Sequence, residues 1–167
     1  MTDIPWEVHE APIERDEPAM LVDLRRCIGC HACSVACKVE HDVPLGEFRM
    51  RVRWMESPSG KVAFLPVFAA ESCDYGEARA TVGMPPACVG ACPTGALVLA
   101  DLAAPSPAAR AILEAAEPLT ERGDTKPGVL YRGHEAWQET KLNRGVALDP
   151  RDADIIYEQS YGEGVDR

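Results

Sequence analysis

Seven cysteines in two groups constrain this chain of 167 residues more than any other feature. The first group has the spacing C-x2-C-x2-C-x3-C and consists of Cys27, Cys30, Cys33 and Cys37, and the second consists of Cys73, Cys88 and Cys92. Cysteines this close together along the chain are too crowded to pair with one another in good disulfide geometry, and an odd number cannot pair completely. Metal ligation therefore explains them better than disulfide bonding does.

The spacing of the first group is typical of thiolates that hold iron–sulfur clusters. In such a run three thiolates converge on one cubane, and the fourth, about one helical turn further on, belongs to a second cluster. A distant cysteine followed by proline completes the first cluster, and Cys92 before Pro93 is the candidate. The predicted ligand sets are therefore crossed: Cys27, Cys30, Cys33 and Cys92 bind cluster 1, and Cys37, Cys73 and Cys88 bind cluster 2.

Structural zinc is the competing interpretation of the same cysteines. Zinc is usually held by two cysteine pairs that form one tetrahedron. The run from Cys27 to Cys37 places more thiols together than such a site needs, and the Cys92-Pro93 pair adds the second half of a two-cluster pattern. We therefore favour iron–sulfur clusters over zinc or unused thiols.

The segments around the cysteines predict small helices and short strands. A hairpin is predicted over residues 49–68. Basic and apolar residues alternate over 49–55, turn-forming residues follow at 57–60, and an apolar segment covers 61–68, with Trp54 expected in the core. A helix is expected to begin after Ser106, a good N-cap, with Pro107 at its first position and residues 108–117 as its body. The other expected elements are strands at residues 20–24, 96–100 and within 123–133, and one or two helical turns at 30–40.

These cysteine segments resemble those of a known family, the iron–sulfur electron-transfer subunits that accompany molybdenum or tungsten bis-pterin oxidoreductases. The segment DLRRCIGCHACSVACKVEHDVPLGEFR, residues 23–49, is similar to the first cysteine motif of that family. The segment CDYGEARATVGMPPACVGACPTGALVLADLAAP, residues 73–105, resembles its last motif, and TKPGVLYRG, residues 125–133, is similar to its closing strand. The resemblance covers roughly residues 20–132.

The resemblance implies an α+β, ferredoxin-like two-cluster fold with short antiparallel strands, small helices and extended polar termini. The implied ferredoxin-like iron–sulfur domain spans residues 20–132, between an N-terminal extension, 1–19, and a C-terminal tail that contacts a partner, 133–167. Family members usually carry four clusters, with two further cysteine motifs in the middle of the chain. Only residues 48–72 separate the two motifs here, so we expect a shortened form with two clusters.

A second departure from the family concerns cluster 2. The last motif of the family runs C-x2-C-x11-C-x3-C-P, and its second cysteine position is occupied here by Gly76. Cluster 2 is then left with three cysteines, which is the number that a [3Fe-4S] cluster needs, so we expect one [4Fe-4S] and one [3Fe-4S] cluster. An atypically ligated [4Fe-4S] cluster, with Asp74 or a water on the fourth iron, and a second site that binds no cluster both remain open.

The chain shows no nucleophile with a base, no paired carboxylates in a cleft-forming context and no phosphate-binding glycine loop, so it is not expected to be catalytic alone. The resemblance implies an electron-transfer subunit that relays electrons to or from a molybdenum or tungsten pterin catalytic subunit. A free-standing two-cluster ferredoxin serving several redox partners is the alternative. A zinc-held assembly module is a third hypothesis.

Charge and hydropathy narrow the choice of partners. A net charge of −10 argues against nucleic acid, which binds basic surfaces. No run of about 18 apolar residues is present, so no direct membrane span is expected. The expected partner is the large catalytic subunit, with a membrane-anchor, cytochrome or other redox subunit as a further candidate. The start of the chain lacks the pattern of an export signal, which favours a cytoplasmic location, or a periplasmic one if the chain is exported with its partner.

Overall fold

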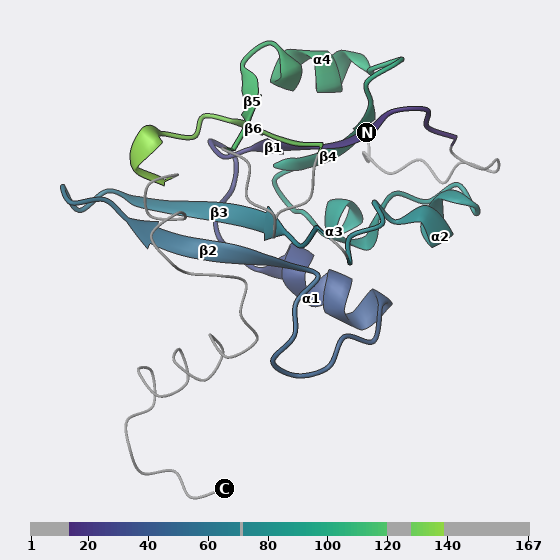
Figure 1. Cartoon of the computed structure of the whole chain (residues 1–167), viewed down its shortest axis with the longest axis horizontal. Helices are drawn as coiled ribbons and strands as arrows, with labels where there is room; N and C mark the ends of the chain where they lie inside the picture. Colours follow the sequence, from purple (N-terminus) through teal and green to yellow (C-terminus); the bar gives the residue numbers. More distant parts are fainter. Residues whose placement is uncertain (1–13, 71, 120–127, 139–167) are drawn as a thin grey trace, which may run out of the picture.

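Two β-sheets form the body of the protein in the computed structural model, which describes residues 14–70, 72–119 and 128–138. The larger sheet has the strand order β4-β1-β6-β5, and the smaller one is the hairpin β2-β3 (Figure 1). The strands of the larger sheet are β1 (Pro18–Asp23), β4 (Leu97–Asp101), β5 (Ala116–Pro118) and β6 (Val129–Arg132). The hairpin consists of β2 (Met50–Glu56) and β3 (Val62–Phe68).

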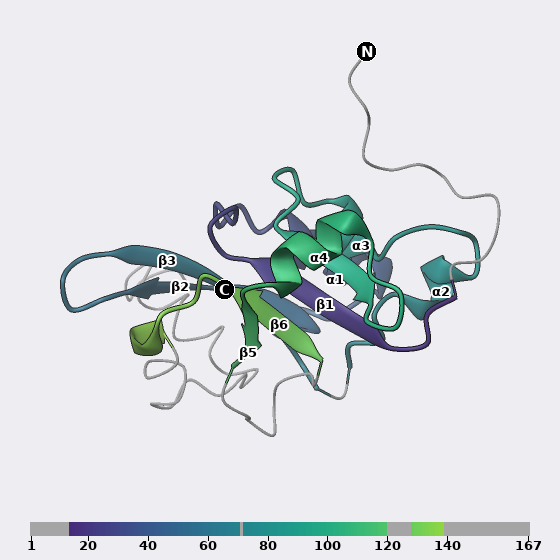
Figure 2. The same cartoon turned by 90° about the horizontal axis from the view of Figure 1, so that it is seen from above.

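The four labelled helices lie on different sides of the larger sheet, and a further helical turn covers residues 136–138. The labelled helices are α1 (Ala32–Glu40), α2 (Glu77–Ala80), α3 (Ala87–Gly90) and α4 (Pro107–Leu113). Helix α4 covers one face of the larger sheet, and the hairpin lies on the opposite side (Figures 1 and 2). Helices α1 and α3 pack against each other beside the hairpin. No helix in the described ranges is long and apolar enough to cross a membrane.

Strand β1 is the centre of the fold because it is buried on both faces. Ala19 and Leu21 pack with Ala109 and Ile112 of α4, whereas Met20 and Val22 belong to the core cluster shared with the hairpin. Successive side chains of a strand point to opposite faces, so one continuous apolar strand serves both layers. Burying both faces explains why the apolar residues of β1 do not alternate with polar ones.

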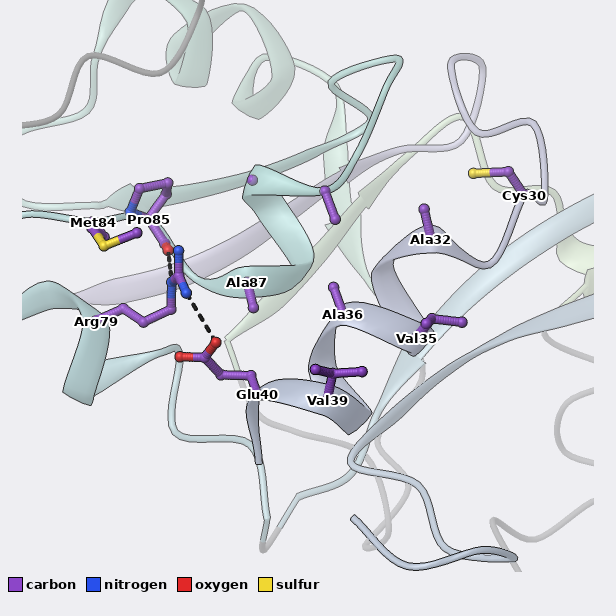
Figure 3. A pocket seen from close by; sticks show the side chains of 12 residues that line it. Cys30, Ala32, Val35, Ala36, Val39, Glu40, Arg79, Met84, Pro85 and Ala87 are labelled. Atoms are coloured by element: carbon purple, nitrogen blue, oxygen red, sulfur yellow. Dashed lines mark hydrogen bonds and ion pairs between the residues drawn. The ribbon is translucent and has the colours of Figure 1, made fainter. Parts of the chain in front are cut away.

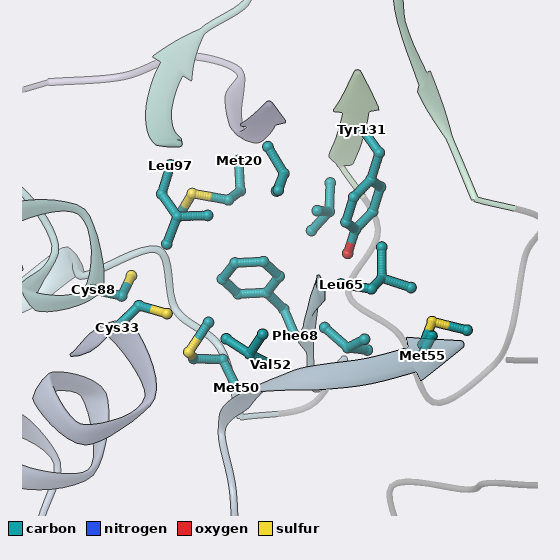
Figure 4. Packing of buried hydrophobic residues seen from close by; sticks show 13 residues of the cluster. Met20, Cys33, Met50, Val52, Met55, Leu65, Phe68, Cys88, Leu97 and Tyr131 are labelled. Atoms are coloured by element: carbon teal, nitrogen blue, oxygen red, sulfur yellow. The ribbon is translucent and has the colours of Figure 1, made fainter. Parts of the chain in front are cut away.

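The larger core cluster joins the two sheets and reaches the cysteines (Figure 4). Phe68 is 1% exposed and lies among Met20, Leu97 and Tyr131, with Cys33 and Cys88 at the edge of the same cluster. The buried Tyr131 hydroxyl donates a hydrogen bond of 2.8 Å to the Pro66 carbonyl oxygen, which links β6 to β3. This core therefore ties the cysteine-bearing helices to both sheets.

The structure confirms most of the expected elements. The hairpin forms with its turn at residues 57–60, and the Ser106 Oγ accepts a hydrogen bond of 3.2 Å from the Ala109 backbone N–H, as an N-cap does. The strand expected at 96–100 is β4, the one expected within 123–133 is β6, and the helical turns expected at 30–40 are α1.

Three expectations differ from the structure, and two helices were missed. Trp54 is 71% exposed, so its predicted place in the core is wrong: it shares a face of β2 with the buried Met50 and Val52 but lies nearer the turn, where that face is no longer covered. The strands are not all antiparallel, because β1 and β6 pair in parallel. Helix α4 ends at Leu113, and the following residues form β5 because they pair with β6. The short helices α2 and α3 were not predicted.

Short parts of the predicted end segments are described and pack on the body. The backbone N–H groups of Asp16 and Glu17 donate to the Asp101 carboxylate at 3.3 and 3.0 Å. Near the other end, Lys61 and Glu135 form an ion pair, and Trp137 packs against the larger core cluster. Most of the two predicted end segments, including Trp6, lies outside the described residues, so the domain boundaries at 19/20 and 132/133 remain predictions.

Candidate metal centres

The seven cysteines line two separate pockets, in the grouping that the crossed ligand sets predict. The first pocket is lined by Cys27, Cys30, Cys33 and Cys92, and the second by Cys37, Cys73 and Cys88. All seven lie in the described part of the chain, and none forms a disulfide. Among the described residues, no group of three or more His, Cys, Asp or Glu side chains is close enough to hold one metal ion. The thiols thus surround two spaces instead of converging on a point.

Each of two neighbouring helical segments contributes one thiol to each pocket. On α1, Cys33 lines the first pocket and Cys37 the second, one helical turn later. On and just after α3, the order is reversed: Cys88 lines the second pocket and Cys92 the first. Because α1 packs against α3, the two pockets lie side by side and share the helices as walls.

The loop before α1 turns sharply so that the first three cysteines face the first pocket. Gly29 has φ +69° and His31 has φ +60°, both in the left-handed region, and α1 begins at Ala32. A Cβ atom on Gly29 would lie 2.3 Å from the Phe64 ring, so no larger residue fits beside the hairpin at this point. Gly29 therefore allows the loop to pass close to β3 while Cys27 and Cys30 remain in the pocket wall.

The thiols of the first pocket interact electrostatically. Burial raises the pKa of Cys27 and raises that of Cys33 to about 11, and the charges of neighbouring thiolates in the pocket raise both further. Cys92 differs from these two thiols. Burial would raise its pKa, but hydrogen bonds from the backbone N–H groups of residues 94, 96 and 97 and from the Thr94 hydroxyl together lower it. The Ala96 N–H lies 3.3 Å from the Cys92 Sγ and the Thr94 Oγ1 lies 3.7 Å from it.

The second pocket carries a cation, the Arg49 guanidinium, at its wall. Burial raises the pKa of Cys88 to about 12, and the charges of Cys37 and Cys73 act in the same direction. Burial also raises the pKa of Cys37, although the Arg49 guanidinium opposes the effect through its charge and a hydrogen bond. Buried thiols that are close together become thiolates readily when a metal compensates their charge.

Gly76, at the second cysteine position of the family motif, lies where a side chain would be strained and would clash with Pro86. Its φ is +73°, and a Cβ atom would lie 2.8 Å from both the Cα and the Cβ of Pro86. Residues with a Cβ adopt this conformation at a cost of about 1–2 kcal/mol. Both the backbone conformation and the contact with Pro86 therefore favour glycine at the wall of the second pocket.

Asp74, the candidate for an extra ligand, already uses both of its carboxylate oxygens. Oδ1 accepts a hydrogen bond of 2.8 Å from the Gly76 backbone N–H, and Oδ2 forms an ion pair of 3.0 Å with Arg49. Burial would raise the pKa of Asp74, but the Gly76 N–H and the positive charge of Arg49 together lower it. The role of Arg49 was missed in the sequence, where it was only one of several basic residues near β2.

An apolar groove lies next to the first pocket, between α1 and α3 (Figure 3). Cys30 lines one end, and exposed Val35 and Val39 of α1 line the middle. At the other end, the Arg79 guanidinium pairs with Glu40 at 2.9 Å and donates to the Pro85 carbonyl oxygen at 2.7 Å. Cys30 is exposed, so the first pocket reaches the molecular surface at this groove.

Comparison with known proteins agrees with the cysteine pattern. Residues 18–39 match the family model of a 4Fe-4S binding domain. A tetrathionate reductase subunit of Salmonella typhimurium is 36% identical over 91 residues, which are 54% of this chain and 33% of that protein. The thiosulfate reductase electron transfer subunit of Salmonella typhi is 44% identical over 79 residues, covering 46% of this chain and 37% of that protein.

A third relative carries a more general name. The electron transport protein HydN of Escherichia coli is 37% identical over 91 residues, which are 53% of this chain and 47% of that protein. The chain therefore matches between a third and a half of the length of these relatives. Relatives named as a thiosulfate reductase electron transfer subunit and as an arsenate respiratory reductase iron–sulfur subunit confirm the resemblance inferred from the cysteine segments.

Proposed function

We propose that this homologue of reductase iron–sulfur subunits is a two-cluster electron relay that serves a larger catalytic subunit. The observation that carries the proposal is the crossed arrangement of the cysteines. The α1 segment and the α3 segment each place one cysteine in each pocket. Bound clusters would accept and release electrons one at a time. The shared helical walls hold the two sites close together, as electron transfer between them requires.

The donor set of the first pocket fits a [4Fe-4S] cluster. Four thiols line one pocket, and N–H and O–H donors aimed at the Cys92 sulfur stabilise its thiolate form. Cys27, Cys30, Cys33 and Cys92 would hold the cluster. The exposure of Cys30 supports the first site as the one nearer to a redox partner.

The second pocket fits a [3Fe-4S] cluster better than a [4Fe-4S] cluster. Three thiols line it, Gly76 has no side chain, and the contact with Pro86 leaves no space for one. Both oxygens of Asp74 are engaged, which weighs against Asp74 as a fourth ligand. Cys37, Cys73 and Cys88 would hold the cluster, and the smaller number of thiolate charges would raise its reduction potential.

The partner that we propose is a catalytic subunit with a molybdenum or tungsten pterin. The support is the family resemblance together with the relatives' names, which describe subunits of tetrathionate and thiosulfate reductases. A membrane-anchor, cytochrome or other redox subunit would be the second contact. A cytoplasmic location remains the favoured proposal, with export alongside the partner as the alternative.

Iron and sulfide analysis with electron paramagnetic resonance tests the clusters. The full chain is purified without oxygen, and we expect seven iron atoms for each chain and a three-iron signal in the oxidised protein. Cys88→Ser should abolish that signal, whereas Cys30→Ser, the matched change in the other pocket, should leave it. A colourless protein that contains zinc would refute the relay.

Co-purification tests the partner. When the chain is tagged in its native host, we expect a large chain that contains molybdenum or tungsten to accompany it in a fixed ratio. A monomer that carries both clusters and binds no large chain would instead identify a free-standing ferredoxin.

A further inference from the structure

An ion pair lies at the wall of the second pocket, on the side where the family motif has its additional cysteine. Arg49, Asp74 and Gly76 line this pocket together with the three thiols. The Arg49 Nη2 lies 3.0 Å from the Asp74 Oδ2, and the Asp74 Oδ1 accepts from the Gly76 N–H at 2.8 Å. A positive and a negative side chain thus occupy the wall where a thiolate is missing.

The backbone holds both members of this pair. The Arg49 carbonyl oxygen accepts a hydrogen bond of 2.9 Å from the Ala69 N–H, where the β2-β3 ladder begins. The Cys73 N–H donates to the Ala69 carbonyl oxygen at 3.2 Å, which fixes the segment before Asp74 to the same end of the hairpin. The Arg49 side chain is 22% exposed, so water screens it only in part.

Arg49 also acts on one of the three thiols. Its guanidinium hydrogen-bonds to Cys37 and places a positive charge beside that sulfur. Reduction adds a negative charge to a cluster and its thiolates, so a nearby cation and hydrogen bonds to sulfur favour the reduced state. A carboxylate paired with the cation limits this effect because it neutralises part of the charge.

We infer that the Arg49–Asp74 ion pair sets the reduction potential of the second cluster, with Arg49 raising the potential and Asp74 limiting the increase. This inference rests on the proposed function, because it requires a cluster held by Cys37, Cys73 and Cys88. Arg49 contacts the ligand sulfur directly. Asp74 acts with the opposite sign, because its negative charge opposes that of Arg49 at the Cys37 sulfur.

A redox titration of the full chain, followed by electron paramagnetic resonance with dithionite as reductant, tests the inference. Arg49→Gln should lower the reduction equilibrium constant of the second cluster about tenfold, which is about 59 mV for one electron, and leave the first cluster unchanged. Asp74→Asn still accepts from the Gly76 N–H but removes the negative charge, so the potential should rise. Arg110→Gln, an exposed change on α4, is the control for net charge and should move neither cluster.

Opposite shifts in the two variants are the decisive result, because a purely structural role would weaken the site without moving the potential in both directions. Equal potentials in wild type and Arg49→Gln, or equal shifts of both clusters, would overturn the inference. If Arg49→Gln fails to retain the second cluster, the test rests on Asp74→Asn. A reduction potential of the second cluster in Asp74→Asn that is equal to or lower than that of wild type would then refute the inference. A wild-type protein without a second cluster would instead overturn the proposed function itself.

Discussion

Gly76→Cys restores the residue type that the family motif has at this position, yet we expect it to destabilise the protein. The left-handed backbone at φ +73° costs a residue with a Cβ about 1–2 kcal/mol. The Cβ would also lie 2.8 Å from two atoms of Pro86, and relieving such overpacking costs about 1–3 kcal/mol. The sum of about 2–5 kcal/mol corresponds to a fall of about 4–20 °C in the midpoint of thermal unfolding.

The assay combines thermal unfolding with electron paramagnetic resonance of the oxidised protein. Gly76→Ala is the matched control, because it introduces the same Cβ without a thiol and should lower the midpoint by a similar amount. The folded fraction of Gly76→Cys should keep the three-iron signal. If Gly76→Cys unfolds at the wild-type midpoint and loses that signal completely, the steric reasoning at Gly76 is refuted.

Further substitutions test the core and the helix start by measuring the free energy of unfolding. Tyr131→Phe should cost about 1–2 kcal/mol, because the buried Pro66 carbonyl oxygen loses its 2.8 Å partner. Burial raises the pKa of Tyr131 far above its ordinary value of 10.0, so above pH 10 the folded protein keeps a proton that the unfolded chain loses. The free energy of unfolding of the wild type should therefore fall as the pH rises above 10, and it should fall less steeply in Tyr131→Phe. Ser106→Ala should cost about 1 kcal/mol through loss of the N-cap, with Ser106→Thr nearly neutral as the control. Phe68→Ala should cost about 3–5 kcal/mol and Trp54→Ala less than about 1 kcal/mol, because Phe68 is 1% exposed and Trp54 is 71% exposed; equal losses would contradict this difference in burial.

Much of the candidate site could be predicted because cluster ligation depends on spacing along the chain. The interval between Cys33 and Cys37 is one helical turn, and that interval is enough to direct the two thiols to different pockets. The hairpin and the N-cap at Ser106 could also be predicted from the sequence, since the alternation of residue types along a strand and helix capping are local properties of the chain. The assignment of the cysteines to clusters remains a prediction until iron is measured.

The role of Arg49 could not be predicted, because it depends on residues that are distant in sequence. Asp74 approaches Arg49 only because the β2-β3 ladder and the Cys73–Ala69 hydrogen bond bring the two segments together. The environment of Trp54 was hidden for a similar reason. How far along β2 a face is covered depends on the layer that packs against it, and Val52 is buried whereas Trp54, two residues later on the same face, is exposed.

By itself, the sequence determined the number of thiols, their division between two sites and the absence of a side chain at residue 76, because these follow from residue identity and spacing. Only the tertiary structure showed three further features. Pro86 packs against Gly76, Arg49 forms an ion pair with Asp74, and Cys30 lines an apolar groove. Ligand spacing is a local property of the chain, whereas steric closure and charge pairing arise only when packing brings distant segments into contact.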